Sequence, residues 1–488
     1  MAHELRAYQA RAIDLVRHSF ATGHRRPLLQ IATGSGKTLI ATHIIERALT
    51  KGKKVAFLVD RIQLIQQACD ALDRAGLDHG VIQGKHERSD RTKPVQVISI
   101  QTLARRNPWE YELGIIDEAH CLHQAHLKML RAWPTVPIIG LSATPWAVGM
   151  GQHFDDLIVP ITIGELVAQG YLVDAQVYAP SAPDMKGAKT VAGDFSGKDV
   201  DARVRKPELI GSILSHWQAL ANNKRTLVMA SNVAHSMELA AMFSAVGIPA
   251  RHIDADTDSE DRRRIIADFR AGKVLVLCSV GVLTTGFDAP EAEVLILARP
   301  TKSRILHVQQ VGRVLRPSPD SGKGSHALIL DHAGNFNRLG WHYDQPEDGL
   351  DMGDKAAQTK KSESTERLPR TCPKCHLVHD SRSPECPSCG YKAVTVKPPE
   401  VRKGKLTLLE RRNVLESDRE KRDFYGMLRY IGAERGYSDG WASHAYKSRY
   451  GDFPTEKVAP IPASNVVRSY AKSLGIRYAK GARKYYGR

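Results

Sequence analysis

The sequence predicts an α/β protein with two tandem parallel-sheet domains, followed by a small metal-binding module and a basic, mainly helical C-terminal region. Three observations support this fold class. Short apolar runs typical of buried strands alternate with helical periodicity over most of the chain. A glycine-rich segment stands between the first such strand and a helix, where phosphate-binding loops occur. Two C-x₂-C repeats then precede a lysine- and arginine-rich C-terminus.

The 488 residues are enough for three or more domains. A stretch rich in Asp, Lys, Ser, Gln and Thr after the second α/β unit is typical of a linker. We therefore expect the divisions to be 1–150 for the first α/β domain, 151–345 for the second, 346–370 for the linker, 371–393 for the metal module and 400–488 for the basic region.

Composition limits the class of protein. The net charge of +17 indicates a polyanionic partner. The sequence has neither an apolar targeting core at Met1–Arg6 nor a run of about 18 apolar residues, so we expect a cytoplasmic protein with no membrane partner. Of the seven cysteines, Cys69, Cys121 and Cys278 are scattered among apolar residues, which is typical of inert core positions rather than of a disulfide framework.

The first chemical motif is the segment Ile31-Ala32-Thr33-Gly34-Ser35-Gly36-Lys37-Thr38. Glycines let the backbone turn tightly, so that N–H groups converge on an anion at the start of a helix. In such a loop Lys37 reaches the β- and γ-phosphates of ATP, and the Thr38 hydroxyl holds Mg²⁺. Ile31 stands where the full pattern has glycine, and an ordinary glycine-containing turn is the alternative that the loop alone leaves open.

The second motif is Asp117-Glu118-Ala119-His120, directly after the apolar strand that begins at Leu113. Adjacent carboxylates at a strand end are costly unless a cation or water uses them. Beside a phosphate loop, Asp117 would hold Mg²⁺ through water, and Glu118 would orient and deprotonate the attacking water. A strand that simply ends in solvent is the alternative.

The second half repeats the alternation and ends in Gln309-Gln310-Val311-Gly312-Arg313-Val314-Leu315-Arg316. We expect Arg313 and Arg316 to lie on one face of a helix, since they are three residues apart. A solvated basic helix face is the usual interpretation of such a pair. Between the two halves, residues 181–206 are rich in Gly, Asp and Lys and suggest a mobile loop.

These motifs, in this order, resemble superfamily 2 helicases of the DEAH type. The resemblance rests on Gln9, the loop through Thr38, the Asp117–His120 box, Ser142-Ala143-Thr144 and the segment that ends at Arg316. It implies two RecA-like domains with ATP in the cleft between them. It also implies that Arg313 and Arg316 act as arginine fingers, which stabilise charge on the transferring phosphoryl group.

The resemblance also assigns roles to individual residues. Those implied to contact the nucleotide are Arg6, Gln9, Thr33, Gly34, Ser35, Gly36, Lys37, Thr38, Asp117, Gly286 and Asp288. Those implied to contact the nucleic-acid backbone are Arg61, Gln101, Thr102, Ser231 and Thr284. Those implied to couple the nucleotide site to the nucleic-acid site are Ser142, Thr144 and Gln309.

The metal module contains Cys372-Pro373-Lys374-Cys375 and, ten residues later, Cys386-Pro387-Ser388-Cys389. Two C-x₂-C knuckles at this distance predict a closed, structural Zn²⁺ site with four thiolates. A haem attachment is the first alternative, since Cys375-His376 completes C-x-x-C-H. A redox pair is the second, although the expected βαβ setting is missing.

Residues 400–488 carry 20 lysines and arginines against 10 acids. From Pro460 on, basic residues and tyrosines alternate without an acid, which suits single-stranded nucleic acid through phosphate contacts and base stacking. A solvated tail is the alternative. The order of motor, four-cysteine module and basic region resembles the RadD-like branch of bacterial and phage helicases. That branch is associated with DNA repair, with recombination and with the single-stranded-DNA-binding protein, and the resemblance implies a location at the nucleoid or, for a phage protein, in the host cytoplasm.

The leading hypothesis is an ATP-driven helicase or translocase on single-stranded or branched DNA, taken to be a monomer. The alternatives are an RNA helicase, the motor subunit of a nuclease, and a zinc- and DNA-binding module with an inert motor.

Overall fold

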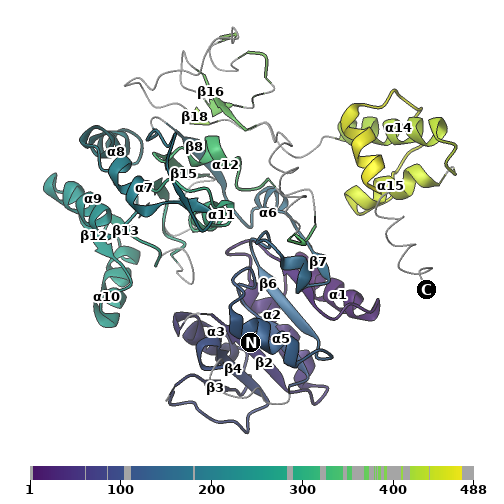
Figure 1. Cartoon of the computed structure of the whole chain (residues 1–488), viewed down its shortest axis with the longest axis horizontal. Coiled ribbons are helices and arrows are strands. Elements are labelled where there is room, and N and C mark those ends of the chain that lie inside the picture. The colour runs from purple at the N-terminus through teal and green to yellow at the C-terminus, as the bar shows by residue number, and fades with distance from the viewer. Residues whose placement is uncertain are drawn as a thin grey trace. The chain divides into compact units, whose positions relative to one another are not determined.

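The computed structural model describes most of the chain. The described residues are 4–60, 62–84, 86–103, 111–179, 182–282, 289–318, 326–344, 349–353, 368–372, 378–379, 381, 383–385, 390–392, 408–409, 418–438 and 440–474. They form two compact units, residues 1–411 and residues 412–488 (Figure 1). No helix in these ranges is long and apolar enough to cross a membrane.

The first domain of unit 1 is a parallel sheet of seven strands in the order β3-β4-β2-β5-β6-β1-β7. Its elements are α1 (Ala7–Ala21), β1 (Pro27–Gln30), α2 (Lys37–Leu49), β2 (Val55–Val59), α3 (Ile62–Arg74), β3 (Gly80–Ile82), β4 (Val95–Ser99), α4 (Ile100–Leu103), β5 (Leu113–Ile116), α5 (Gln124–Ala132), β6 (Ile138–Ser142), η1 (Met150–Gln152) and β7 (Asp156–Ile158).

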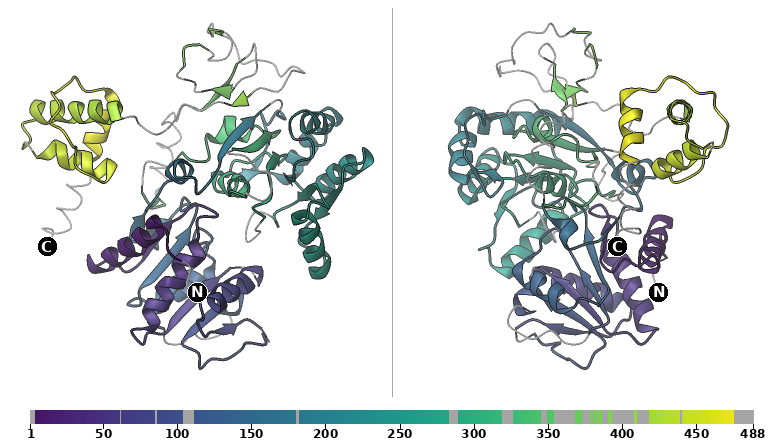
Figure 2. Two further views of the ribbon diagram at one scale, coloured as in Figure 1. Left: turned by 180° about the vertical axis from the view of Figure 1, so that it is seen from behind. Right: turned by 45° about the vertical axis from the view of Figure 1, so that its right-hand side comes forward.

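Helices cover both faces of this sheet (Figures 1 and 2). Successive strand residues point to opposite faces, so Leu29 and Phe57 pack with α1, α2 and α3. Their neighbours Leu28 and Leu58 pack with α4 and α5. A strand buried on both faces reads as a continuous apolar run, which is why periodicity located these strands in the sequence.

The second domain contains another sheet of seven strands, in the order β12-β13-β11-β14-β15-β8-β18. All its strands are parallel except β18 (Leu408–Leu409), which pairs antiparallel with β8. The other elements are α6 (Ile163–Ala168), β8 (Asp174–Tyr178), β9 (Thr190–Val191), β10 (Asp194–Phe195), α7 (Gly197–Val204), α8 (Pro207–Leu220), β11 (Thr226–Met229), α9 (Val233–Ala245), β12 (Ala250–Ile253), α10 (Ser259–Arg270), β13 (Val276–Ser279), β14 (Val294–Leu297), α11 (Arg304–Val311), β15 (His326–Asp331) and α12 (Asn335–Leu339).

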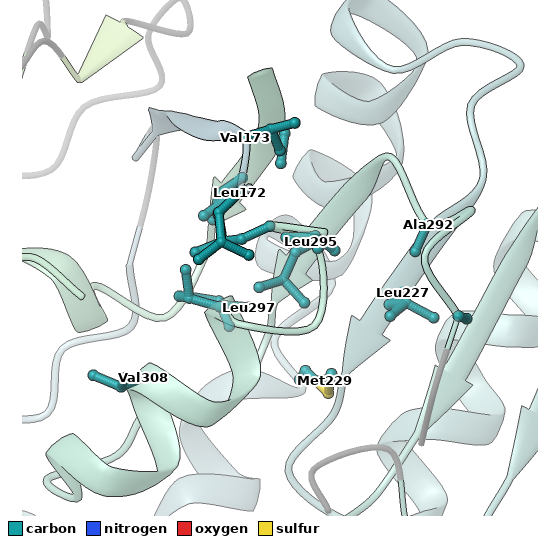
Figure 3. Close-up of a cluster of buried hydrophobic side chains, with 14 of the residues drawn as sticks. Leu172, Val173, Leu227, Met229, Ala292, Leu295, Leu297 and Val308 are labelled. Atoms are coloured by element: carbon teal, nitrogen blue, oxygen red, sulfur yellow. The ribbon is translucent and has the colours of Figure 1, made fainter. Parts of the chain in front are cut away.

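One face of the second sheet supports α11. Leu227, Met229 and Leu297 lie in a buried cluster with Val308 of that helix (Figure 3). The opposite face packs against Trp217 of α8 and other residues of α8 and α9. Two tandem parallel-sheet domains were predicted, and the structure confirms them.

Three segments differ from the sequence-based expectation. The first sheet extends beyond residue 150, because β7 pairs with β1. Residues 182–206 are not a featureless loop, since they form the β9–β10 hairpin and α7. The C-terminal region does not begin at 400 as a separate body, because β18 belongs to the second sheet and the division falls at residue 411.

Part of the expected linker is also ordered and contacts the first domain. The Asp351 carbonyl accepts a hydrogen bond from the N–H of Gly151 (2.8 Å), and its carboxylate accepts one from the N–H of Gly149 (3.1 Å). The Gln152 amide donates to the carbonyl of Met352 (2.8 Å). A segment that follows the second domain in sequence is therefore fixed to the first.

The second unit has its own apolar core. Its elements are α14 (Asp418–Glu434), α15 (Trp441–Tyr450) and a further helical stretch at 465–474. Leu428 and Ile431 of α14 pack with Ala445 of α15 and with Val467 and Leu474. The second unit is therefore a small helical module whose core extends to Leu474.

Candidate functional site

The glycine-rich loop joins β1 to α2, as the sequence predicted. Gly34 and Gly36 have φ values of +86° and +85°, in the left-handed region that favours glycine. Lys37 and Thr38 stand in the first turn of α2, where helix N–H groups are available to an anion. Ile31 is completely buried, so this position serves the core of the first domain rather than the turn.

Lys37 and Glu118 form a largely buried ion pair, with 2.8 Å between Nζ and Oε1. Glu118 follows β5 and has a φ of +47°, which is unusual for a side chain of this size and typical of functional sites. Burial alone would raise the pKa of Glu118, but the positive charges of Lys37 and Arg313 outweigh it and lower that pKa. Glu118 is therefore a carboxylate at neutral pH.

The carboxyl group of the neighbouring Asp117 is partly buried. Burial, and then the negative charge of Glu118, raise the pKa of Asp117 to about 6. A nearby cation would stabilise the ionised form of such a carboxyl group, because its positive charge compensates for the water that burial removes.

Arg313 and Arg316 come to this site from the second domain. With Lys37, Asp117 and Glu118 they line a hollow of about 450 Å³. A Cβ atom placed on Gly34 would lie only 2.6 Å from Nε of Arg316, so the arginine side chain lies directly against the loop. Burial lowers the pKa of Arg313 to about 10, although the charge of Glu118 raises it, so Arg313 stays positively charged at neutral pH.

The two arginines are not on a helix, which corrects the sequence-based expectation. α11 ends at Val311, and Gly312 is its C-cap. The N–H of Arg313 bonds to the carbonyl of Gln310 (3.2 Å) in the turn that follows. Glycine permits close contact here, because a Cβ on Gly312 would lie 3.0 Å from Cβ of Thr33 in the phosphate loop.

A second contact between the domains runs through His120. The Gln309 amide nitrogen of α11 lies 2.8 Å from Nε2 of His120 and 3.4 Å from the Thr144 hydroxyl. On the other side of the ring, Nδ1 of His120 lies 3.0 Å from the Ser142 hydroxyl. The structure thus brings together the residues expected to couple the two activities.

The N-terminal segment also contacts the phosphate loop. Tyr8 and Gln9 both donate hydrogen bonds to the Ser35 carbonyl, at 2.7 and 3.1 Å. The Gln9 oxygen accepts from the N–H of Arg6 (2.9 Å), so both ends of its amide have partners within the chain. The guanidinium group of Arg6 lies 4.5 Å above the ring of Tyr171, which comes from the segment after α6.

The expected nucleic-acid contacts are only partly within the described residues. Gln101 and Thr102 line a hollow of about 840 Å³ together with Arg262 and residues 280–282 of the second domain. The Ser231 hydroxyl is 2.9 Å from Nδ1 of His235. Two of the expected nucleic-acid contacts, Arg61 and Thr284, lie outside the described residues. So do Gly286 and Asp288, which were expected to contact the nucleotide.

The metal module is described in part. Cys372 is buried, whereas Cys375, Cys386 and Cys389 lie outside the described residues. The first knuckle is flanked by β16 (Arg370–Thr371) and β17 (Val378–His379), which pair antiparallel. The bridge between Glu385 and Lys392 flanks the second knuckle. Within the described ranges, which hold one of the four cysteines, no group of three metal-ligand side chains occurs.

Sequence reasoning missed Arg74 and Arg270, which line the hollow beside the phosphate loop. Each stands at the C-terminal end of a helix, α3 or α10, where a basic residue is ordinary because it compensates the helix dipole. No local pattern separates them from other helix-terminal arginines. Tyr171 was missed for a similar reason, since a single aromatic residue in a connection carries no motif.

Comparisons with known proteins agree with this architecture. The family model described as "Type III restriction enzyme, res subunit" matches residues 2–147, and the "Helicase conserved C-terminal domain" matches residues 205–318. The chain is similar to a 51.5 kDa protein of a Lactococcus phage, with 30% identity over 371 residues that make up 75% of this chain and 77% of the phage protein.

It is also 30% identical over 359 residues to the putative ATP-dependent helicase IRC3 of Saccharomyces cerevisiae. That alignment covers 68% of this chain and 51% of the yeast protein. The chain therefore spans about half the length of that relative. A solved fragment of a putative HsdR subunit of a type I restriction enzyme from Vibrio vulnificus has the same fold, with a TM-score of 0.55, 20% identity and coverage of 73% of this chain and 68% of that chain. The chain therefore belongs to the superfamily 2 helicases that combine a ResIII domain with a helicase C-terminal domain, and it is an ATP-hydrolysing enzyme.

Proposed function

We propose that this helicase couples ATP hydrolysis to movement along DNA or to its unwinding. One observation carries the proposal. Lys37 and Glu118 of the first domain and Arg313 and Arg316 of the second line a single hollow beside the phosphate loop. A nucleotide in that hollow would contact both domains at once, so that its binding and release would close and open the cleft between them.

The buried ion pair supports the role of Glu118 as general base. When Lys37 moves from Glu118 to the phosphates, Glu118 loses the charge that lowers its pKa and becomes a stronger base for the attacking water. Arg313 and Arg316 compensate the charge that develops on the transferring phosphoryl group.

The residues present suit Mg²⁺, since a carboxylate and a hydroxyl at a phosphate loop are its usual protein ligands. Asp117 and Thr38 would hold the ion, which would neutralise phosphate charge when bound.

One observation favours DNA as the polymer. The family model of the first domain is named for a restriction enzyme, a class that acts on DNA. The net charge of +17 suits a polyanion of either kind. RNA is the alternative polymer. A role as the motor subunit of a nuclease is the second candidate, favoured by the likeness of the fold to a restriction subunit.

The test compares ATPase rates with single-stranded DNA, duplex DNA, forked DNA and RNA under one set of conditions. Glu118→Gln should retain ATP binding and lose nearly all hydrolysis, because it removes the base and leaves Asp117 and Thr38 in place. Lys37→Ala should weaken binding and turnover together. Equal stimulation by RNA and DNA would contradict the DNA assignment, and wild-type hydrolysis by Glu118→Gln would contradict the assignment of the base.

We further propose that the four cysteines hold one structural Zn²⁺ in a ribbon, as in the RadD-like branch. The antiparallel pairs beside each knuckle and the burial of Cys372 support this. Elemental analysis of the purified protein should find one zinc per chain, and replacing Cys372 and Cys375 by serine should remove it. Iron, or no metal, would contradict a zinc ribbon.

A further inference from the structure

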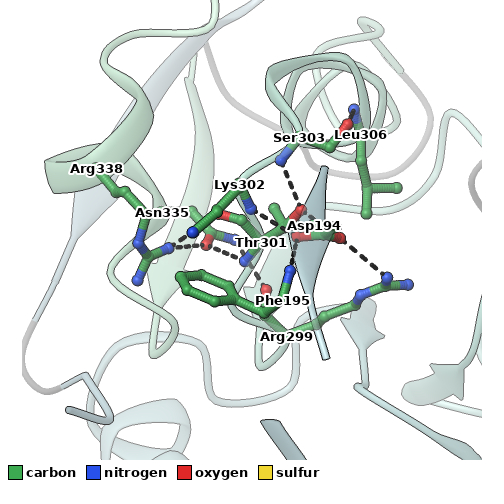
Figure 4. Close-up of polar contacts among 9 residues, drawn as sticks. All are labelled: Asp194, Phe195, Arg299, Thr301, Lys302, Ser303, Leu306, Asn335 and Arg338. Carbon is green, nitrogen blue, oxygen red and sulfur yellow. Dashed lines mark hydrogen bonds and ion pairs between the residues drawn. The ribbon is translucent and has the colours of Figure 1, made fainter. Parts of the chain in front are cut away.

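The β9–β10 hairpin is inserted between β8 and α8 and contacts a loop that lies more than a hundred residues later (Figure 4). That loop, residues 299–303, joins the end of β14 to the start of α11. It is the only covalent connection from the second sheet into the N-terminus of the helix that carries Gln309 and leads to Arg313. Whatever fixes this loop also fixes where α11 begins.

One carboxylate makes most of the contact. Asp194 accepts hydrogen bonds from the N–H of Lys302 (2.7 Å) and the hydroxyl of Thr301 (2.9 Å). It also forms an ion pair with Arg299, at 3.3 Å, and accepts from the N–H of Phe195 (2.8 Å). Three groups of the loop (a guanidinium group, a hydroxyl and a backbone N–H) therefore converge on a single side chain.

The neighbouring ring and hydroxyl strengthen the attachment. The ring of Phe195 lies 5.0 Å from Nζ of Lys302 and 5.2 Å from the guanidinium group of Arg338, both at cation–π distance. Nζ of Lys302 also donates to the hydroxyl of Thr190 in β9 (2.6 Å). Both strands of the hairpin thus contact the loop.

The loop transmits this attachment to the helix. Thr301 is completely buried, and its hydroxyl, which donates to Asp194, accepts from the N–H of Ser303 (2.9 Å). The Ser303 hydroxyl in turn accepts from the N–H of Leu306 and caps α11 (3.2 Å). Because α11 is a rigid two-turn element, a displacement at its cap would reach Gln309 and the turn that holds Arg313.

We infer that Asp194 is a positioning residue for ATP hydrolysis, which acts through α11 by holding the 299–303 loop so that Gln309 and Arg313 meet the first domain correctly. The inference rests on the proposed role of Arg313. A misplacement of about 1 Å in such a group can cost about 100-fold in rate, so a surface hairpin far from the phosphate loop can matter to turnover.

The test uses the full-length protein and measures kcat and KM for ATP at saturating single-stranded DNA. Asp194→Ala should lower kcat by roughly tenfold with little change in KM for ATP, because the phosphate loop and Lys37 are untouched. Asp194→Asn, which keeps one acceptor oxygen for the N–H of Lys302, should lose less. Asp199→Ala is the matched control, since Asp199 accepts from the N–H of Lys189 within the same insertion (2.6 Å) and, among the described residues, does not bond to the 299–303 loop.

A double-mutant cycle separates positioning from general destabilisation. In an Arg313→Ala background, Asp194→Ala should lower the residual rate by less than about twofold, because the group that it positions is already gone. A full tenfold further loss, or a wild-type kcat for Asp194→Ala, would overturn the inference. If Asp194→Ala lowers the melting temperature sharply, the kcat of Asp194→Asn is compared with that of the wild type instead. A lowered kcat supports the inference, and a wild-type kcat overturns it. Wild-type turnover by Arg313→Ala alone would instead overturn the proposed function.

Discussion

The amide nitrogen of Gln309 lies 2.8 Å from Nε2 of His120, so that the helix leading to the arginines meets the acidic strand end directly. Burial lowers the pKa of His120, although the charge of Glu118 raises it, and the imidazole is neutral at pH 7. A neutral ring with its proton on Nδ1 can donate to Ser142 and accept from Gln309. A neutral His120 ring thus joins α11 to Ser142 at the end of β6.

Gln309→Ala should uncouple the domains without preventing ATP binding. The substitution removes the bonds to His120 and Thr144 but leaves the phosphate loop intact. We expect the stimulation of ATPase by DNA to fall several-fold, with a nucleotide affinity close to that of the wild type. Gln124→Ala, an exposed position on α5, is the control. Undiminished stimulation would show that the contact is structural.

The close approach of Arg316 to Gly34 gives a second prediction. Arg316→Ala should lower turnover by roughly 10³-fold or more and leave the melting temperature nearly unchanged, as expected of an arginine finger. Arg316→Lys should not restore it, because an ammonium group lacks the planar fork of guanidinium. Pre-steady-state phosphate release would measure the loss, and full turnover by either variant would place the finger elsewhere.

Gly34→Ala tests the contact between Arg316 and the phosphate loop by a change in the loop. Its Cβ would meet Arg316 at 2.6 Å, in addition to the strain of a φ of +86°. Gly52→Ala is a matched control, since Gly52 has a φ of +70° and a Cβ there meets no other heavy atom of the described residues within 4 Å. Both should cost about 1 kcal/mol or more in stability, and only Gly34→Ala should reduce ATPase.

The second domain should lose stability in acid because of its buried histidines. Burial lowers the pKa of His235 to about 4 and those of His307 and His332 to about 3. Above pH 6.5 these rings are neutral in the folded and in the unfolded chain, so they do not change the free energy of unfolding. As the pH falls below 6.5, the unfolded chain binds protons that the folded chain excludes. Between pH 6.5 and 5, each should remove about 2 kcal/mol from the free energy of unfolding.

Urea unfolding at several pH values would measure this dependence. His307→Phe should flatten it by about 2 kcal/mol, since the buried ring lies edge-on to Phe336 and a phenyl ring in its place does not bind a proton. Gln124→Ala, at an exposed position of α5 that does not titrate, is the control. An identical acid sensitivity in His307→Phe and wild type would contradict the burial argument.

The sequence was sufficient for the elements that a single strong pattern defines. Strands such as β2 and β5 are buried on both faces and read as continuous apolar runs, and the glycine loop lies between β1 and α2 as expected. The helix through Arg316 was predicted wrongly, because Gly312 was taken for an interior residue and is the C-cap of α11. Two residues three apart cannot show by themselves whether a helix continues.

What sequence could not provide were contacts between distant segments. The bonds of Asp194 to the loop at 299–303, and of Asp351 to η1, join positions more than a hundred residues apart. Each is a short polar side chain in a Gly- and Asp-rich stretch, a composition that equally suits an unstructured loop. Tertiary partners decide such cases, and no local signal in the sequence identifies those partners.

The last prediction concerns the basic C-terminus. Val467, Ala471 and Leu474 belong to the core of the second unit, so a truncation at residue 460 would remove core residues along with charge. Residues 475–488, which lie outside the described part of the chain, carry Arg477, Lys480, Arg483, Lys484 and Arg488 and no acid. If about half of these five contact phosphates, deleting residues 475–488 should flatten the log–log salt dependence of single-strand binding by roughly 2 units. Fluorescence anisotropy of a labelled oligonucleotide over a series of salt concentrations would measure it, with maximal ATPase at saturating DNA as the control for an intact motor.

Tyr485→Ala with Tyr486→Ala should weaken binding and leave the slope unchanged, because stacking releases no counterions. An unchanged slope after the deletion would mean that the tail does not bind nucleic acid, whatever the motor does.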